Sequence, residues 1–456
     1  MLDEAIFFFG DKRLLATGQE FISCIIEKVN LTVHQIAPDW NAEISFGRFL
    51  RNARVNIRSI KCAFMDNSTV LNDSCRGRSV LLVEDTSALS FGDEPRLSGL
   101  GKIGSGTSNG FYMHPVIGLD ARDGNCLGLA EVQVFQRKSY APDDPMHDKK
   151  YRQKECQKLP FEEKESHRWL SAVKTALKRT PDAVRHTVIA DRECDIYEAL
   201  CGYADLKCDF VIRTQYLDRR LNKTRTGPYL YGELDDMPVQ GTYTLQLPAT
   251  DKRSAHEATL EIKFGSVVLA RPKTGLVKHL RPILRVNIVE VKECPESVAN
   301  NEQAVHRVLI TSHEIENVRD AQVIVRYYRW RWVIEQVFRT LKSQGLNIEK
   351  TGVKTYERAS KLAIMALIAA VKILQLVQAR DGSTQSVESV FTPTEIEVLE
   401  KLNPRLEGKT EKSKNPFQKE NLAYASWIMA RLGGWKGYKS QRPPGPIIMK
   451  TGLIKF

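Results

Sequence analysis

Two short runs of branched apolar residues, each followed by an aspartate, constrain the fold of this chain most strongly. The run SVLLVE at 79–84 leads into Asp85, and HTVIA at 186–190 leads into Asp191. Runs of this length between polar residues are typical of strands buried on both faces. A helical pattern, WLSAVKTALKR at 169–179, stands between them. This alternation of strand and helix predicts an α/β core.

The two aspartates follow the strands directly, which gives them two possible roles. In open α/β sheets, ligands bind at the carboxyl ends of the strands, so Asp85 and Asp191 stand where a catalytic acid would be placed. A strand-terminal aspartate also commonly caps the turn or helix that follows it. The pair alone does not decide between catalysis and capping.

A third acid lies in the stretch YYRWRWVIEQVFRTLKSQG at 327–345. At about 100° per residue, Tyr328, Arg331, Glu335 and Lys342 fall within a sector of about 60° on one helix. The other side of this helix carries Val333, Ile334, Val337, Phe338 and Leu341. We expect the apolar side to pack on the sheet and the polar stripe to face outward. A solvated helix with mixed charges would show similar clustering.

Three carboxylates brought together would repel one another unless divalent cations neutralised them. Mg²⁺ suits carboxylate and phosphate oxygens, and two such ions can promote an in-line displacement at phosphorus. Arg331 and Lys342 could hold neighbouring phosphates, while Tyr328, Trp330 and Trp332 offer flat faces to unstacked bases. The combination is typical of a site that cuts DNA.

Composition supports a polyanionic partner and argues against several other classes of protein. The chain has 456 residues and a formal net charge of +12, as many nucleic-acid-binding proteins do. Its nine cysteines form no CxxC pair, which favours reduced thiols in the cytoplasm. The longest apolar run, 362–371, is short of the ~18 residues of a membrane helix, so we expect a buried helix. No signal peptide is expected at the amino terminus.

The motifs match those of a known family in order and spacing. They are Y-x2-R-x3-E-x6-K from Tyr328 to Lys342, EDTS at 84–87 and DRE-x-D at 191–195. With them the sequence resembles the cut-and-paste DDE transposases of the insertion-sequence-four family, and within it most the Tn-five (insertion-sequence-fifty) transposase. Further similar segments are GDKR at 10–13, RFLRN at 48–52, FVIRT at 210–214, ITS at 310–312, FTPTE at 391–395 and ARLGGW at 430–435.

The resemblance implies a ribonuclease H-like (retroviral-integrase-like) α/β catalytic core with an antiparallel β-sheet insertion, plus helical N- and C-terminal domains. The matching division is a helical domain that binds transposon-end DNA at 1–56, a catalytic core at 57–380 and a helical dimerisation or pairing domain at 381–456. The β-rich insertion would span 214–311, where the sequence itself has several strand-like segments, among them ATLEIKF at 258–264 and SVVLARP at 266–272.

By motif match, the resemblance implies that Asp85, Asp191 and Glu335 are the catalytic triad and bind two Mg²⁺ ions, for which Mn²⁺ can substitute. It also implies a set of DNA-binding residues. These are Tyr328, Arg331, Lys342, Arg192, Arg213, Trp332, Arg307, Arg48, Arg51 and Arg13. Arg307 departs from the pattern, because the similar transposase carries there a Trp that stacks on a flipped base; a guanidinium plane can also stack. Gln215 departs too, since it replaces a Lys.

The implied reaction is nicking that frees a 3′-hydroxyl, hairpin formation, hairpin opening and strand transfer into target DNA. The implied partners are double-stranded DNA, as inverted-repeat ends and as target, and a second copy of the chain in a synaptic homodimer. We expect a bacterial cytoplasmic, nucleoid-associated protein without a membrane partner. Both ends look short, since the chain starts just before GDKR and stops at Phe456. The alternatives are therefore a non-catalytic DNA-binding or regulatory derivative and a simple metal-dependent nuclease.

Overall fold

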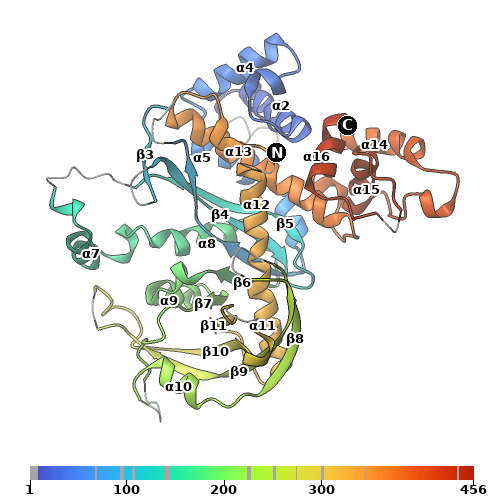
Figure 1. Ribbon diagram of the computed structural model, residues 1–456. Helices are drawn as coiled ribbons and strands as arrows, with labels where there is room; N and C mark the ends of the chain where they lie inside the picture. Colours follow the sequence, from blue (N-terminus) through green and yellow to red (C-terminus); the bar gives the residue numbers. More distant parts are fainter. Residues whose placement is uncertain are drawn as a thin grey trace.

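The computed structural model contains one large mixed β-sheet flanked by helices (Figure 1). It describes residues 9–66, 69–92, 97–104, 108–137, 144–222, 227–249, 253–273, 275–298, 302–343, 345–438 and 441–456. The strands are β1 (Ser79–Glu84), β2 (Ser87–Ser90), β3 (Gly101–Ile103), β4 (Ser108–Asp120), β5 (Cys126–Phe135), β6 (Arg185–Ala190), β7 (Asp209–Arg213), β8 (Gly241–Leu247), β9 (His256–Ala270), β10 (Ile283–Glu293) and β11 (His306–Thr311). Their order across the sheet is β2-β4-β1-β6-β7-β11-β10-β9-β8, and β3 and β5 both pair with β4.

The helices lie on both faces of this sheet and at one end of it (Figure 1). They are α2 (Lys12–Lys28), α3 (Val33–Ile36), α4 (Trp40–Arg51), α5 (Ile57–Lys61), α6 (Val70–Cys75), α7 (Lys149–Gln157), α8 (His167–Arg179), α9 (Tyr197–Asp205), α10 (Leu230–Asp236), α11 (Val318–Trp330), α12 (Trp332–Lys342), α13 (Tyr356–Ala379), α14 (Pro393–Leu406), α15 (Leu422–Leu432) and α16 (Pro446–Lys455). A π-helical turn (Cys62–Asp66) follows α5, and short 3₁₀ turns include η4 (Arg192–Cys194).

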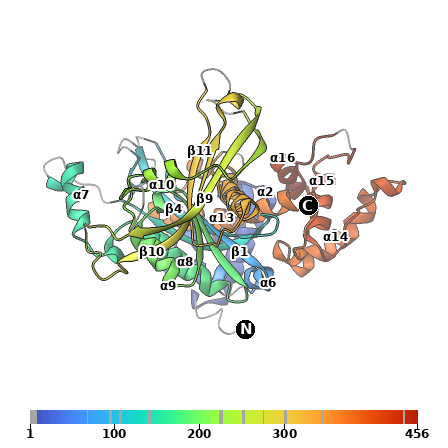
Figure 2. The same ribbon diagram turned by 90° about the horizontal axis from the view of Figure 1, so that it is seen from below.

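The predicted α/β core is present, with β1 buried on both faces. Its alternate residues enter two different hydrophobic clusters, as side chains of a strand must. Val80 and Leu82 pack with residues of α8 and α9, whereas Leu81 and Val83 pack with residues of α12 and α13. The helices therefore cover opposite faces of the sheet (Figure 2). β1 pairs in parallel with β6, and β6 in parallel with β7, which is typical of strands joined through helices.

The β-rich segment predicted at 214–311 does not form a separate sheet. Its strands β8 to β11 are antiparallel and extend the core sheet, because β11 pairs with β7. ATLEIKF and SVVLA, which the sequence presented as separate strand segments, form the single strand β9. The segment also contains α10, which the sequence analysis did not predict. Residues 223–226, 250–252, 274 and 299–301 of this segment lie outside the described part of the chain.

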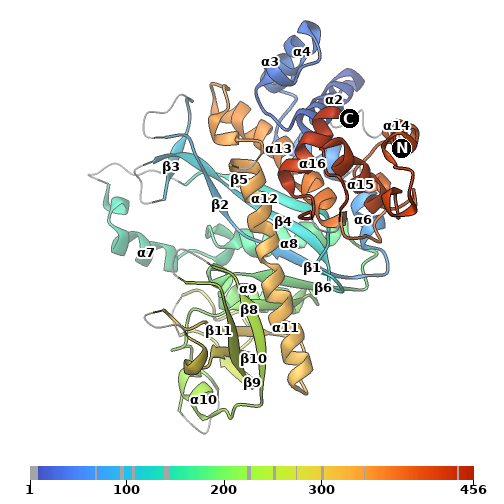
Figure 3. The ribbon, with the colours of Figure 1, turned by 45° about the vertical axis from the view of Figure 1, so that its right-hand side comes forward.

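The helix α13 joins the terminal helices to the core. It packs against α2, α4, α5, α12, α15 and α16, as well as β5. It is long and apolar enough to cross a membrane, but 78% of its apolar window is buried inside the protein, which confirms the predicted buried helix. Because α16 also packs against α2, the first and last described helices lie side by side (Figure 3).

A buried lysine fixes the end of α4 on this helix. Lys361 of α13 is 1% exposed, and its Nζ donates to the carbonyl oxygens of Leu50 at 3.1 Å and Asn52 at 3.2 Å. A cation at a helix C-terminus satisfies free carbonyls and interacts favourably with the helix dipole. Its charge is also paired with Glu357 at 2.6 Å. The turn of α4 that carries Arg48 and Arg51 is therefore anchored to the core.

Candidate active site

Asp85 and Asp191 lie at the ends of neighbouring parallel strands. Val83 of β1 pairs with Ile189 of β6, and each aspartate follows its strand residue by two positions. Each carboxylate accepts a hydrogen bond from the backbone just after it: Asp85 from the N–H of Thr86 and Asp191 from the N–H of Glu193, both at 2.8 Å. The capping role and the position expected of a catalytic acid therefore occur together.

The third acid, Glu335, comes from a helix that is interrupted once. Tyr328 ends up on α11 and Glu335 on α12, with a tight turn at Arg331 between the two helices. There the hydrogen bonds span three residues, from the N–H of Arg331 to the Tyr328 carbonyl and from the N–H of Ile334 to the Arg331 carbonyl. The single continuous helix of the sequence prediction is wrong at this residue.

The polar stripe does not face outward as predicted. Arg331 is only 15% exposed at the side chain, and its Nη1 donates to Asp85 at 2.6 Å. Its Nη2 lies 3.6 Å from Glu335, and Lys342 donates to the carbonyl of Ala88 at 2.5 Å. The stripe thus lies against the ends of β1 and β2. The predicted apolar side is buried as expected, at Val333, Ile334, Val337, Phe338 and Leu341.

The charges of Asp191 and Glu335 act on Asp85, and Arg331 lies between Asp85 and Glu335. Burial raises the pKa of Asp85 to about 7; the Arg331 charge opposes this rise, and the Asp191 and Glu335 charges add to it. Their electrostatic effect places all three carboxyl groups in one region. Among the described residues, no three histidine, cysteine or acidic side chains are close enough together to hold a metal as they stand.

Further basic residues of the predicted set gather beside Tyr328. Burial raises the pKa of Tyr328, and the charges of Arg331, Arg213 and Arg307 counteract this effect. Arg307 on β11 is exposed as a whole residue. Its pKa is nevertheless lowered, by partial desolvation of the guanidinium and by the neighbouring Arg213 charge. Arg253 contributes to the same lowering and was not predicted from the sequence. The cluster offers several cations to an anionic ligand.

The aromatic and flanking residues fall into two groups. Trp332 is 51% exposed, so part of its ring is accessible, and the Arg339 guanidinium lies over the ring 5.4 Å from its centroid. Trp330 instead packs on the Gly124 turn, where an added Cβ would lie 2.5 Å from the ring. Its expected stacking on bases is therefore not supported. Arg192 is exposed in the turn just after Asp191.

Three predicted DNA-binding residues lie outside this cluster. Arg48 and Arg51 are exposed in the last turn of α4, and Arg13 is exposed at the start of α2, where it pairs with Asp11 at 3.2 Å. These helices stand at the opposite end of the molecule from β8 to β11 (Figure 1). The structure therefore separates a basic N-terminal surface from the strand β11 that carries Arg307 (Figure 1).

A set of hydrogen bonds that joins the loops of the two aspartates was not predicted from the sequence. Arg168 of α8 donates to Thr86 and Glu193, which lie in the loops that carry Asp85 and Asp191. Arg168 stands in ESHRWL at the start of a helix, where nothing local distinguishes it from a solvated arginine. Only the fold brings it to both loops.

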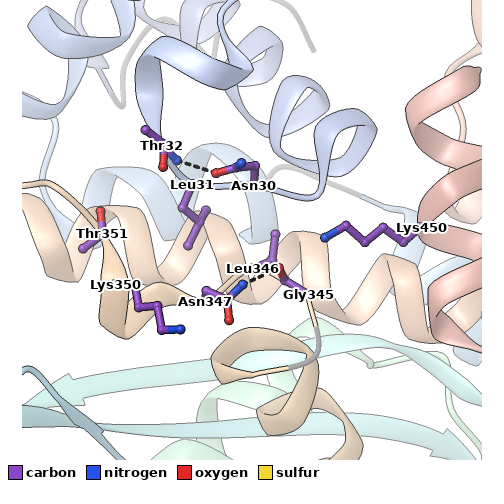
Figure 4. A pocket seen from close by; sticks show the side chains of 9 residues that line it. All are labelled: Asn30, Leu31, Thr32, Gly345, Leu346, Asn347, Lys350, Thr351 and Lys450. Carbon is purple, nitrogen blue, oxygen red and sulfur yellow. Dashed lines mark hydrogen bonds between the residues drawn. The ribbon is translucent and has the colours of Figure 1, made fainter.

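A separate cavity of about 220 Å³ lies where α2, the α12–α13 connection and α16 meet (Figure 4). Its lining is polar and basic and contains none of the predicted site residues. It comprises Asn30, Leu31, Thr32, Gly345, Leu346, Asn347, Lys350, Thr351 and Lys450. The cavity marks the junction of the terminal helices with the core.

Two comparisons with known proteins show what this chain is similar to. Residues 164–372 match the family model described as a transposase DDE domain, a span that includes Asp191 and Glu335 and begins after Asp85. The chain is also similar to a chain in the cryo-EM structure of a piggyBac transposase synaptic complex with hairpin DNA. That similarity has a TM-score of 0.36 at 10% sequence identity, over 88% of this chain and 74% of the other. Residues 164–372 are therefore similar to a transposase DDE domain.

Proposed function

We propose that this chain is a DNA transposase that carries out metal-dependent phosphoryl transfer at transposon ends, in the insertion-sequence-four family and near the Tn-five transposase. The reactions are nicking, hairpin formation and opening, and strand transfer into target DNA. The observation that carries the proposal is that Asp85, Asp191 and Glu335 come together beside Arg331, a residue type that commonly binds phosphate. The transposase DDE domain match supports it.

The donor set fits divalent cations. Asp85, Asp191 and Glu335 offer hard carboxylate oxygens, which Mg²⁺ and Mn²⁺ prefer. The Arg331 guanidinium, placed between Asp85 and Glu335, stands in for part of the positive charge that these acids require. When bound by these residues, two cations would activate a water or a 3′-hydroxyl and stabilise the leaving oxygen.

The chain's own residues would bind and orient the DNA. Arg331 would exchange its ion pair with Asp85 for a DNA phosphate, which leaves the carboxylate free. Tyr328, Lys342, Arg213, Arg307 and Arg192 would hold neighbouring phosphates, as guanidinium and ammonium groups do. The exposed face of Trp332 would stack on an unpaired base at the bent terminus.

The proposal extends to organisation and partners. Arg13, Arg48 and Arg51 would contact end DNA from a domain at 1–56, and residues 381–456 would pair two copies in a synaptic homodimer. Their anchoring to the core through α13 supports this arrangement, because DNA held by α4 would be fixed relative to the acids. A bacterial cytoplasmic location is part of the same proposal.

The direct test is cleavage of DNA that carries the inverted repeats flanking the gene. Purified protein with Mg²⁺ or Mn²⁺ is expected to nick this DNA and form hairpins, followed on gels. Asp85→Ala, Asp191→Ala and Glu335→Ala should each abolish cleavage and keep DNA binding in a mobility-shift assay. Cleavage retained in any of the three would contradict the assignment, and cleavage without hairpins or strand transfer would favour a simple nuclease.

A second candidate is a non-catalytic DNA-binding derivative. It is favoured by the finding that, within the described residues, the acids do not yet form a metal-binding cluster. Light scattering with and without end DNA separates the two. A monomer that binds ends, never pairs them and never cuts them would support this candidate.

A further inference from the structure

Arg168 links the two loops that carry the strand-end acids. Its side chain is 9% exposed. Its Nε donates to Thr86 Oγ1 at 3.0 Å, and its Nη2 donates to Glu193 Oε2 at 3.2 Å. Thr86 directly follows Asp85, and Glu193 follows Asp191 by two residues. One guanidinium therefore spans the two loops.

A chain of hydrogen bonds that runs from Thr86 to Cys194 also joins the loops of Asp85 and Asp191. Thr86 Oγ1 lies 2.9 Å from His114 Nδ1, and His114 Nε2 lies 3.1 Å from Glu84. Tyr203 donates to the other oxygen of Glu84 at 2.9 Å, and its hydroxyl lies 3.2 Å from the Sγ of Cys194. Cys194 belongs to the turn that follows Asp191.

These links position the acids because each carboxylate is held by its own loop. Asp85 accepts from the N–H of Thr86, and Asp191 accepts from the N–H of Glu193. Arg168 therefore binds the side chains of Thr86 and Glu193, the two residues whose backbone N–H groups donate to the carboxylates. A guanidinium suits this task, since its planar donors point in fixed directions.

We propose that Arg168 is a positioning residue that sets the separation of Asp85 and Asp191 before a cation binds. The inference rests on the proposed function, because it assumes that these acids bind a divalent cation. Arg168 contacts neither acid in the structure and is not itself a catalytic residue. Outer partners of metal ligands typically change metal affinity by about 10- to 100-fold when they are removed.

The test is Mn²⁺ binding by isothermal titration calorimetry on the full chain without DNA, with Asp85→Asn as the blank. Arg168→Met is expected to lower the Mn²⁺ affinity by about tenfold or more. Arg168→Lys should restore little of it, because one ammonium group cannot reproduce donors fixed in two directions. Full recovery by lysine would overturn the bridging role, since charge alone would then suffice.

The matched control is Arg179→Met on the same helix. Arg179 is 8% exposed and, like Arg168, bridges two side chains, here those of Asp66 and Glu131, both at 2.5 Å. These partners are not in the loops of Asp85 and Asp191. We expect Arg179→Met to lose about as much thermal stability as Arg168→Met and to keep wild-type Mn²⁺ affinity. A comparable loss of Mn²⁺ affinity in Arg179→Met would overturn a specific role for Arg168.

A double-mutant cycle with Glu193→Gln completes the test. If Arg168 acts by holding Glu193, the two substitutions should lower Mn²⁺ affinity together by less than the product of their separate effects. Unchanged affinity in Arg168→Met, with wild-type binding intact, would overturn this proposal alone. A wild-type protein without Mn²⁺ binding that depends on Asp85 would overturn the proposed function as well.

Discussion

The candidate active site has two halves that are held by different interactions. The strand half consists of the loops that carry Asp85 and Asp191, and the helix half is α12 with Glu335. The loops of Asp85 and Asp191 rest on a buried hydrogen-bonded layer that includes Glu84 and His114, both 0% exposed. Glu335 on α12 is 34% exposed at the side chain, and it pairs with Arg331 at 3.6 Å. The strand half is therefore built before any ligand arrives, whereas the helix half is held by charges that a phosphate or a cation can replace.

The largest effect is expected from breaking the buried layer of the strand half. Burial raises the pKa of Glu84 well above its ordinary value and lowers that of His114 well below its ordinary value, so it favours the neutral form of both. The Glu84 hydroxyl can then donate to His114 Nε2. Glu84→Ala is expected to lower the free energy of unfolding by about 3 kcal/mol, because it leaves a cavity and two unpaired groups. Urea denaturation measures this loss.

Glu84→Gln is the matched control for that prediction. Its amide can donate to His114 and accept from Tyr203, as the protonated acid does. We expect it to cost less than about 1 kcal/mol. A loss as large as that of Glu84→Ala would show that Glu84 is ionised in the folded protein.

The next effect concerns competition between protons and cations for Asp85. Because the pKa of Asp85 is raised to about 7, the folded protein holds this proton more tightly than the unfolded chain does. The stability from protonated Asp85 is therefore present at low pH and is lost as the pH rises toward about 7. Mn²⁺ affinity should change in the opposite direction, falling about tenfold per pH unit below that pKa. Calorimetric titrations across this range test the slope, and a flat profile would contradict it.

Loss of Arg331 from the helix half should change Mn²⁺ affinity in the direction opposite to the change expected for Arg168→Met. Arg331 competes with a cation for Asp85 and Glu335, so Arg331→Ala is expected to raise Mn²⁺ affinity without DNA about tenfold at a pH well above 7. DNA cleavage should nevertheless fall, since a phosphate contact is lost. Arg329→Ala, an exposed neighbour on α11, serves as the control of equal charge. Weaker Mn²⁺ binding in Arg331→Ala would remove the contrast between the halves.

The smallest effect is expected at Lys342, at the far end of α12. Burial lowers its pKa, and its ammonium group donates to the Ala88 carbonyl, so it is already partly held in place. Lys342→Ala should weaken end-DNA binding and reduce the salt slope by about one unit. Fluorescence anisotropy over a salt series measures the slope. Lys409→Ala, exposed beyond α14, should leave it unchanged.

Much of the fold could be predicted because its signals are local. The run at 79–84 and the run at 186–190 became β1 and β6, and the buried side of the helix around Glu335 was correct to the residue. Periodicity reports which side of an element is apolar. It could not show that the segments around 258–264 and 266–270 form one strand, because that depends on pairing with β10.

The candidate site was predictable only in its composition. Strand-end position and helical phase pointed to Asp85, Asp191 and Glu335. The break at Arg331 and the inward-facing stripe were missed, since a helix of mixed charge has the same pattern on a solvated surface. Arg253 and Arg168 were missed because their neighbours in the sequence give no sign of their partners in space.

The sequence by itself determined the buried strands that precede Asp85 and Asp191, the apolar side of the helix around Glu335, and that the third acid lies on a basic helix. Only the tertiary structure decided that Arg331 reaches Asp85, 246 positions away, and that Arg168 reaches Thr86, 82 positions away. The physical reason is that secondary structure follows from interactions within a few residues. The charge balance of a site depends instead on how whole helices dock on a sheet.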